Sequence, residues 1–200
     1  MNLDAHAKRA QELALTLGVR SPRVKRGKLS ESLLPEGIWT RTAVYRPYIA
    51  ITPAFGNLTT AEQDSELAQA VVLADLIESG TPKLLCIASI GSVASIALAG
   101  FVTTALDVPA RLWAEVAITL FVGLYLGMYL VHMLSWTRRM FYQADRRIAE
   151  VLGAPAVTTS VQVSRRMRYK RRGLFGLWIG LSMPNEGRRL DAIADLAPVS

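Results

Sequence analysis

Apolar residues recur with helical spacing at the start of the chain. The intervals of three and four residues that define one helix face join Leu3, Ala7, Ala10, Leu13, Ala14 and Leu17. Gly18 follows, and glycine commonly ends a helix. The pattern predicts an amphipathic helix over residues 3–17. Charged residues interrupt this stretch, so we expect no signal peptide here.

The pattern changes over the next thirty residues. Residues 20–30 are basic and rich in turn-forming types, which predicts a connector. Residues 41–52 mix β-branched and aromatic residues, which predicts a pair of strands. Pro47 cannot donate a backbone hydrogen bond, and this favours an edge position for its strand.

A second helix is predicted to begin near Thr59. Thr59 and Glu62 have the spacing of a capping box, in which each side chain bonds the other residue's free backbone N–H. The sequence is then almost entirely apolar over 70–77, which indicates a buried helix. Gly80 and Pro82 are predicted to end it.

Two long uncharged stretches follow. Residues 84–106 form a run of 23 and residues 116–137 a run of 22. A helix needs about 20 apolar residues to cross a bilayer. Because only residues 107–115 separate the runs, we expect a transmembrane hairpin with both flanks on one side. The sequence therefore predicts a membrane protein rather than a purely soluble one.

The distribution of charge predicts the orientation of this hairpin. The chain has 23 Lys and Arg against 16 Asp and Glu, and residues 138–200 alone contain 12 basic and 5 acidic residues. Basic residues favour the cytoplasmic side of a membrane. We expect a multi-pass protein of the cytoplasmic (inner) membrane with both termini in the cytoplasm. Cys86 is the single cysteine, so no intrachain disulfide can form.

Small residues mark one face of each predicted span. Gly91, Ser95 and Ala99 recur every four residues in the first, and Gly123 and Gly127 form a GxxxG in the second. Small residues let helices approach closely. They can pack the hairpin against itself or form a homo-oligomer, and both interpretations remain open.

A dense basic segment lies at 165–172. Its six cations are Arg165, Arg166, Arg168, Lys170, Arg171 and Arg172. No nucleic-acid-binding motif accompanies them, so we expect no nucleic acid partner. Anionic lipid headgroups attract such segments by about 1 kcal/mol per basic residue. A solvated helix face is the alternative interpretation.

The order of several segments resembles the HtpX-like membrane zinc metallopeptidases, relatives of the CAAX prenyl proteases. Those segments are 51–58 (ITPAFGNL), 66–80 (ELAQAVVLADLIESG), the hairpin, 138–152 with its Ala-Asp-Arg, and 183–193 (MPNEGRRLDAI). In that family a capped helix carries HExxH, a hairpin commonly intervenes, E-[YF]-x-A-D-R supplies the third zinc ligand, and H-P-x-x-x-x-R-I closes the domain. The resemblance covers nearly the whole chain.

The departures from this family pattern bear on function. Aligning VVLADLIESG with the family's AVLAHELGHI puts Asp75 and Ser79 at the two His positions and Leu76 at the Glu. Phe141 takes the place of the third ligand, while Asp145 and Arg189 match. HExxH chemistry needs two histidines one turn apart and a Glu general base. The resemblance therefore implies a degenerate site with no catalytic residues, no metal and no cofactor.

The predicted fold is mainly α-helical, with the hairpin inserted in a small zincin-like α+β cytoplasmic domain. The expected halves are 1–82 and 138–200, around a hairpin region at 83–137. The leading hypothesis is a non-catalytic binding or regulatory protein with a protein partner or a membrane substrate. One alternative is an active zinc peptidase with a divergent site around Asp75, Glu78 and Asp145. The other is a two-span interaction protein unrelated to peptidases.

Overall fold

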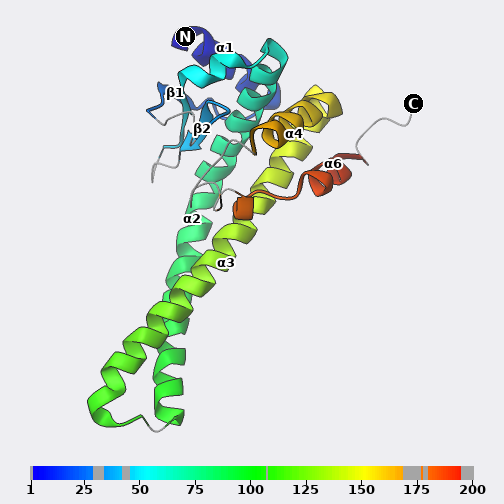
Figure 1. The fold of residues 1–200 in the computed structure, drawn as a ribbon. Helices are drawn as coiled ribbons and strands as arrows, with labels where there is room; N and C mark the ends of the chain where they lie inside the picture. Colours follow the sequence, from blue (N-terminus) through cyan, green and yellow to red (C-terminus); the bar gives the residue numbers. More distant parts are fainter. Residues whose placement is uncertain are drawn as a thin grey trace. The chain divides into compact units, whose positions relative to one another are not determined.

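The computed structural model describes residues 2–28, 34–41, 46–106, 108–168, 177 and 180–194. The chain is mostly helical, with two long apolar helices and a small three-stranded sheet (Figure 1). It divides into two compact units. We call Met1–Ser79 with Thr137–Ser200 the sheet-bearing unit, and Gly80–Trp136 the hairpin unit.

Helix α1 (Leu3–Leu17) confirms the first predicted helix. Asn2 caps its beginning, since the Asn2 side chain accepts a bond from the backbone N–H of Ala5. Gly18 ends it in the left-handed conformation at φ 63°. That conformation suits glycine because it has no Cβ. The buried face of α1 includes Leu13 and Leu17.

The sheet contains β1 (Arg23–Arg26), β2 (Ile38–Arg41) and β3 (Tyr48–Ile51) in the order β1-β3-β2. Strand β1 pairs parallel with β3, and β2 pairs antiparallel with it. The connector predicted over 20–30 was therefore wrong in part, because it contains β1. The edge position inferred from Pro47 was also wrong. Pro47 precedes β3, so this central strand keeps its own N–H donors.

After a short 3-10 helix η1 (Pro53–Asn57), helix α2 extends over Thr60–Ala105. The predicted capping box is present. The Thr59 N–H donates to Glu62 Oε2 at 2.9 Å, and the Glu62 N–H donates to Thr59 Oγ1 at 3.4 Å.

The predicted end of this helix at Gly80 and Pro82 was wrong, because α2 continues through both residues. Proline removes one backbone donor. The helical hydrogen bonds on either side of Pro82 remain. The apolar sequence beyond Pro82 favours a continuous helix, because a helix satisfies its own backbone N–H and C=O groups.

Helix α3 (Ala110–Leu152) continues from the second apolar run into the sheet-bearing unit, as predicted. Gly153, at φ 88°, ends it. Pro155 lies in the first turn of α4 (Ala154–Arg168), where proline is well tolerated. The last helix of the described residues, α6 (Glu186–Ala194), begins after Asn185 as predicted, and Asn185 Oδ1 accepts the Gly187 N–H.

The core of the sheet-bearing unit contains apolar side chains from the sheet and from helices α1, α2, α3, α4 and α6. Members include Leu17 of α1, Ile49 of β3, Val71 of α2, Ile148 of α3 and Val157 of α4. Each of these is at most 2% exposed. Residues far apart in the sequence therefore share one core, to which both flanks of the hairpin contribute.

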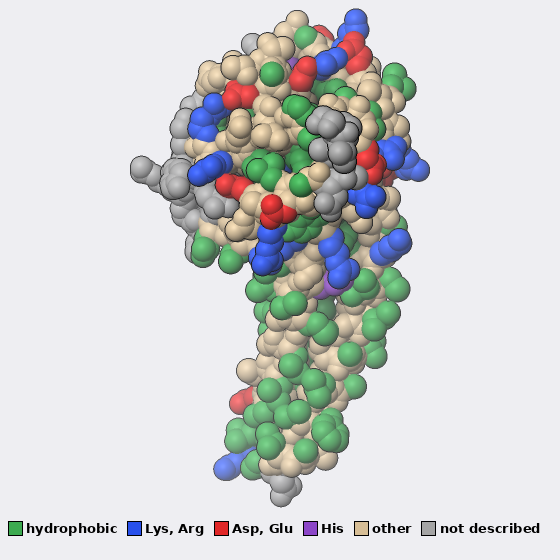
Figure 2. Space-filling view, turned by 90° about the vertical axis from the view of Figure 1, so that its right-hand side faces the viewer, with side chains coloured by type: hydrophobic (Ala, Val, Ile, Leu, Met, Phe, Trp, Pro, Cys, Tyr) green, Lys and Arg blue, Asp and Glu red, His purple; other side chains and the backbone are tan. Residues whose placement is uncertain are grey.

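In the hairpin unit, α2 and α3 are long and apolar enough to cross a membrane. Hydrophobic side chains cover much of the surface of this unit (Figure 2). Exposed examples are Ile90, Val93, Phe101, Ile118 and Val131. Exposed apolar surface of this extent is typical of a region that contacts a membrane or another protein.

Loss of the α2 cap is expected to have a modest cost. Thr59→Ala should lower the free energy of unfolding by about 1 kcal/mol, because the Glu62 N–H loses its side-chain acceptor. Denaturant unfolding of the purified protein measures this. Thr60→Ala, one position along and also exposed, is the control and should change stability by less than about 0.5 kcal/mol. Equal effects of the two substitutions would contradict a capping role.

Candidate functional site

A buried polar network lies at the centre of the sheet-bearing unit. It draws one or two side chains from each of four helices, and none is more than 6% exposed: Glu66 and Gln69 of α2, Asp145 of α3, Ser160 of α4 and Arg189 of α6. Burying so many polar groups is costly unless they bond one another. Their mutual bonds define the site.

Asp145 and Arg189 form a bidentate ion pair. Arg189 Nε donates to Asp145 Oδ2 at 2.7 Å, and the second donor of the guanidinium reaches Oδ1 at 2.7 Å. The Arg189 guanidinium also lies 5.5 Å from the centre of the Phe141 ring. Such two-point, charge-assisted pairing fixes geometry as well as charge. It therefore sets how α6 sits on α3.

A chain of hydrogen bonds continues from this pair towards α4. Gln69 Nε2 donates to Asp145 Oδ1 at 3.2 Å. Ser160 Oγ lies 3.0 Å from Gln69 Oε1 and 2.9 Å from Glu66 Oε1. One hydroxyl proton cannot serve both acceptors at once. A protonated Glu66 that donates to Ser160, which in turn donates to Gln69, gives each of these two contacts its own proton.

The ionisation of Glu66 agrees with this proton arrangement. Burial raises the pKa of the Glu66 carboxyl from its ordinary 4.5 to about 7, against the opposing effects of Ser160 and Arg189. Burial also raises the pKa of Asp145, while its bonds from Arg189 and Gln69 act in the other direction. Glu62, one turn before Glu66, differs: its pKa is lowered, chiefly by its bond to Arg166.

The predicted site residue Asp75 lies apart from this network. Its Oδ1 accepts the backbone N–H of Arg20 at 3.2 Å, on the side of α2 that faces the segment after α1. Glu78 pairs with the Arg20 guanidinium at 3.0 Å. Ser79 Oγ donates to the carbonyl of Leu76 in its own helix. No contact described in the structure links Asp75 or Ser79 with Phe141.

Helix geometry explains why Asp75 does not contact the network. Residues of an α-helix are separated by about 100°, so Asp75 is rotated about 120° from Gln69. Leu73, four residues after Gln69, lies on nearly the same face as Gln69. The face of α2 turned towards Asp145 therefore contains Glu66, Gln69 and Leu73.

The carboxylates suggested as metal ligands do not gather. Asp145 is bonded to Arg189 and Gln69, whereas Asp75 and Glu78 are bonded to Arg20. Among the residues that the structure describes, no group of three His, Cys, Asp or Glu side chains is placed to hold a metal ion.

The small residues of the two apolar runs have different surroundings. Ser95 and Ala99 are each 2% exposed, and a Cβ on Gly91 would meet the Met128 side chain at 2.9 Å. This stripe packs the hairpin against itself. By contrast, a Cβ on Gly123 or Gly127 would meet nothing within 4 Å. Their GxxxG face is open.

The basic segment is described only at its beginning. Arg165 is exposed, and Arg166 forms an ion pair with Glu62 at 2.9 Å. That pair joins the start of α2 to the end of α4. The Arg168 side chain and Lys170, Arg171 and Arg172 lie outside the described residues. Part of the predicted lipid-binding set thus has an intramolecular role.

Sequence reasoning missed Glu66, Gln69 and Ser160 as members of one site. The signal available was modest: two polar residues three apart, Glu66 and Gln69, where the polar start of α2 gives way to its apolar stretch. Such residues share a helix face. Their partner in α4 lies more than 90 residues away, and only the folded chain brings Ser160 to them.

Comparison with protein-family models, curated proteins and solved structures finds no match to this chain.

Proposed function

We propose that this chain is a membrane-resident, non-hydrolytic homologue of the HtpX-like metallopeptidases that acts by binding. Its two apolar helices would cross the cytoplasmic membrane as a hairpin. The sheet-bearing unit would then lie on the cytoplasmic side, where basic residues are favoured. The observation that carries the proposal is the buried Asp145–Arg189 pair.

This pair joins the two positions that match the family framework. Asp145 belongs to the Ala-Asp-Arg that resembles the family's third-ligand motif, and Arg189 belongs to the late Arg-Leu that resembles its closing segment. The sequence offers no reason for two chance matches, 44 residues apart, to meet in a buried bidentate contact. Their contact supports a shared framework.

The same geometry favours a different register for α2. Gln69, not Asp75, is bonded to Asp145. Aligning Leu67, Ala68 and Gln69 with the Leu-Ala-His of the family motif puts Ala70 at the Glu position and Leu73 at the second His. This register is six residues earlier than the one expected from the sequence.

In the new register the site residues do not fit a zinc ion. Catalytic zinc takes three ligands from His, Cys, Asp and Glu. Leu73 and Phe141 have no donor atom, and both ends of the Gln69 amide are already bonded within the network. Ala70 cannot act as a general base. In this proposal the polar network would take the place of the family's metal, with a structural role.

The alternative of a divergent active site has less support. It requires Asp145 to act with Asp75 and Glu78, but the first is held by Arg189 and the others by Arg20. The alternative of an unrelated two-span protein leaves the Asp145–Arg189 coincidence unexplained.

Zinc binding by designed variants tests the proposal. The triple variant Gln69→His, Leu73→His, Phe141→Glu restores a family-like ligand set in the new register, and we expect it to bind zinc at least about tenfold tighter than the wild type. The matched control is Asp75→His, Ser79→His, Phe141→Glu, which we expect to bind no better than the wild type. Equilibrium titration with a competing zinc chelator measures both.

Two outcomes would contradict the proposal. Stoichiometric, tightly bound zinc in the purified wild-type protein would show that the ancestral chemistry persists. A gain of affinity in the Asp75 and Ser79 variant alone would show that the new register is wrong. Denaturant unfolding of each variant verifies that its zinc affinity refers to folded protein.

A further inference from the structure

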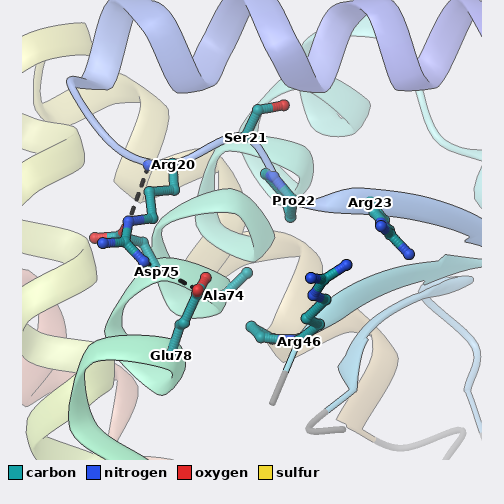
Figure 3. A pocket seen from close by; sticks show the side chains of 9 residues that line it. Arg20, Ser21, Pro22, Arg23, Arg46, Ala74, Asp75 and Glu78 are labelled. Atoms are coloured by element: carbon teal, nitrogen blue, oxygen red, sulfur yellow. Dashed lines mark hydrogen bonds and ion pairs between the residues drawn. The ribbon is translucent and has the colours of Figure 1, made fainter.

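A charged pocket opens in the sheet-bearing unit, away from the buried network. It has a volume of about 250 Å³ and lies between the segment that follows α1, the residues before β3, and helix α2 (Figure 3). All of its lining residues belong to the sheet-bearing unit. The pocket therefore does not depend on how the two units are placed.

One wall of the pocket is acidic. Asp75 and Glu78 approach from α2, and Arg20 neutralises Glu78 through their 3.0 Å pair. The Arg20 backbone N–H donates to Asp75 Oδ1 at 3.2 Å. Among the described residues Oδ2 of Asp75 has no bonded partner, so one carboxylate oxygen is available to a ligand.

The other wall is basic. Arg23 and Arg46 line it, with guanidinium groups on the same side of the pocket in Figure 3. Within the part of the chain that the structure describes, neither side chain has an ion pair or hydrogen bond. Two guanidinium groups that share a small pocket are suited to a phosphate, because each presents several N–H donors in a fixed plane.

The size and position of the pocket further limit which ligands it can bind. Its volume is below the roughly 300–1,000 Å³ typical of sites for drug-sized molecules. Glu78 precedes the predicted span 84–106 by six positions in the same helix, fewer than two turns. We propose that this pocket binds a zwitterionic headgroup of the phosphoethanolamine type. Its phosphate would meet Arg23 and Arg46, and its ammonium would meet Asp75.

The chemistry of the pocket stands independently of peptidase ancestry, whereas a membrane lipid as its source rests on the membrane location proposed above. The same headgroup chemistry occurs in free phosphoethanolamine. Two probes therefore separate the sources: short-chain phosphatidylethanolamine in micelles, and O-phosphoethanolamine in solution. Binding of both is expected for a lipid site, with the lipid tighter.

Calorimetric titration of the purified full chain tests the basic wall. The double variant Arg23→Gln, Arg46→Gln is expected to weaken binding of phosphatidylethanolamine at least about tenfold, since two charge-assisted contacts are lost. The double variant Arg26→Gln, Lys28→Gln is the matched control. It removes the same two positive charges at and just after the exposed end of β1, where neither residue lines the pocket, so its affinity should remain within about twofold of wild type.

The acidic wall is tested by headgroup selectivity. Wild type is expected to prefer phosphatidylethanolamine to phosphatidylglycerol, which has no ammonium, and Asp75→Asn should abolish that preference. Equal weakening by the Arg26 and Lys28 control and by the Arg23 and Arg46 variant would overturn the proposal, as would an unchanged preference in Asp75→Asn. Binding of O-phosphoethanolamine without the lipid would overturn the lipid source and retain the pocket chemistry. Failure of the hairpin to associate with vesicles would instead count against the proposed function.

Discussion

Arg189→Ala is expected to lower the free energy of unfolding by about 3–5 kcal/mol. Removing the guanidinium leaves the Asp145 carboxylate fully buried and without its two charge-assisted bonds. An uncompensated buried charge, rather than the lost attraction itself, accounts for most of that cost. Denaturant unfolding followed by circular dichroism measures it.

Two further variants separate the pair from its neighbours. Arg188→Ala removes the adjacent, exposed arginine and should change stability by less than about 0.5 kcal/mol. The double variant Asp145→Leu, Arg189→Met should recover most of the loss, because two apolar side chains leave no unpaired charge. If the double variant is as unstable as Arg189→Ala, packing at α6 and not charge compensation explains the effect.

Stability is expected to fall as the pH rises through the range in which Glu66 titrates. The folded-state pKa of about 7 exceeds the ordinary 4.5. The folded protein therefore binds the Glu66 proton more tightly than the unfolded chain does. No difference exists below about pH 4.5, and the penalty grows to about 3 kcal/mol above pH 7, at 1.36 kcal/mol per pKa unit.

Glu66→Gln isolates this contribution. The amide keeps the size of the side chain and can donate to Ser160 as a protonated carboxyl does. The variant should match wild type near pH 4.5 and be more stable by about 2–3 kcal/mol at pH 8, as measured by unfolding across this range. Glu62→Gln should behave oppositely, being less stable than wild type at neutral pH, since the pKa of Glu62 is lowered by Arg166. If the difference in free energy of unfolding between wild type and Glu66→Gln does not vary with pH, Glu66 does not titrate in this range.

The two carboxylates of α2 show how position alone decides ionisation. Glu62 and Glu66 are one turn apart and identical in chemistry. Glu62 reaches a cation at the helix start, whereas Glu66 is enclosed among Ser160, Gln69 and the core. Desolvation disfavours the charged form, and a nearby opposite charge favours it.

Local features of the chain determined the beginnings and ends of several helices. Helix 3–17 follows from its apolar spacing and Gly18, and the start of α2 follows from Thr59 and Glu62, because these signals act within one helical turn. The two long apolar helices follow equally directly from composition. Strand β1 was not predicted, because its four residues are largely exposed and mostly basic and lack the alternating pattern of a strand.

The face that α2 presents to its partners required the tertiary structure. A helix that is apolar nearly all round has little periodicity, so the sequence alone allowed either Asp75 or Gln69 to face Asp145. Only the folded chain selects Gln69, through contacts that span 76 residues to Asp145 and 91 to Ser160. The sequence by itself placed Asp145 and Arg189 in two segments whose resemblance to one family remains a prediction. Their pairing, and the buried polar network beside them, depended on packing between distant segments, which no local rule encodes.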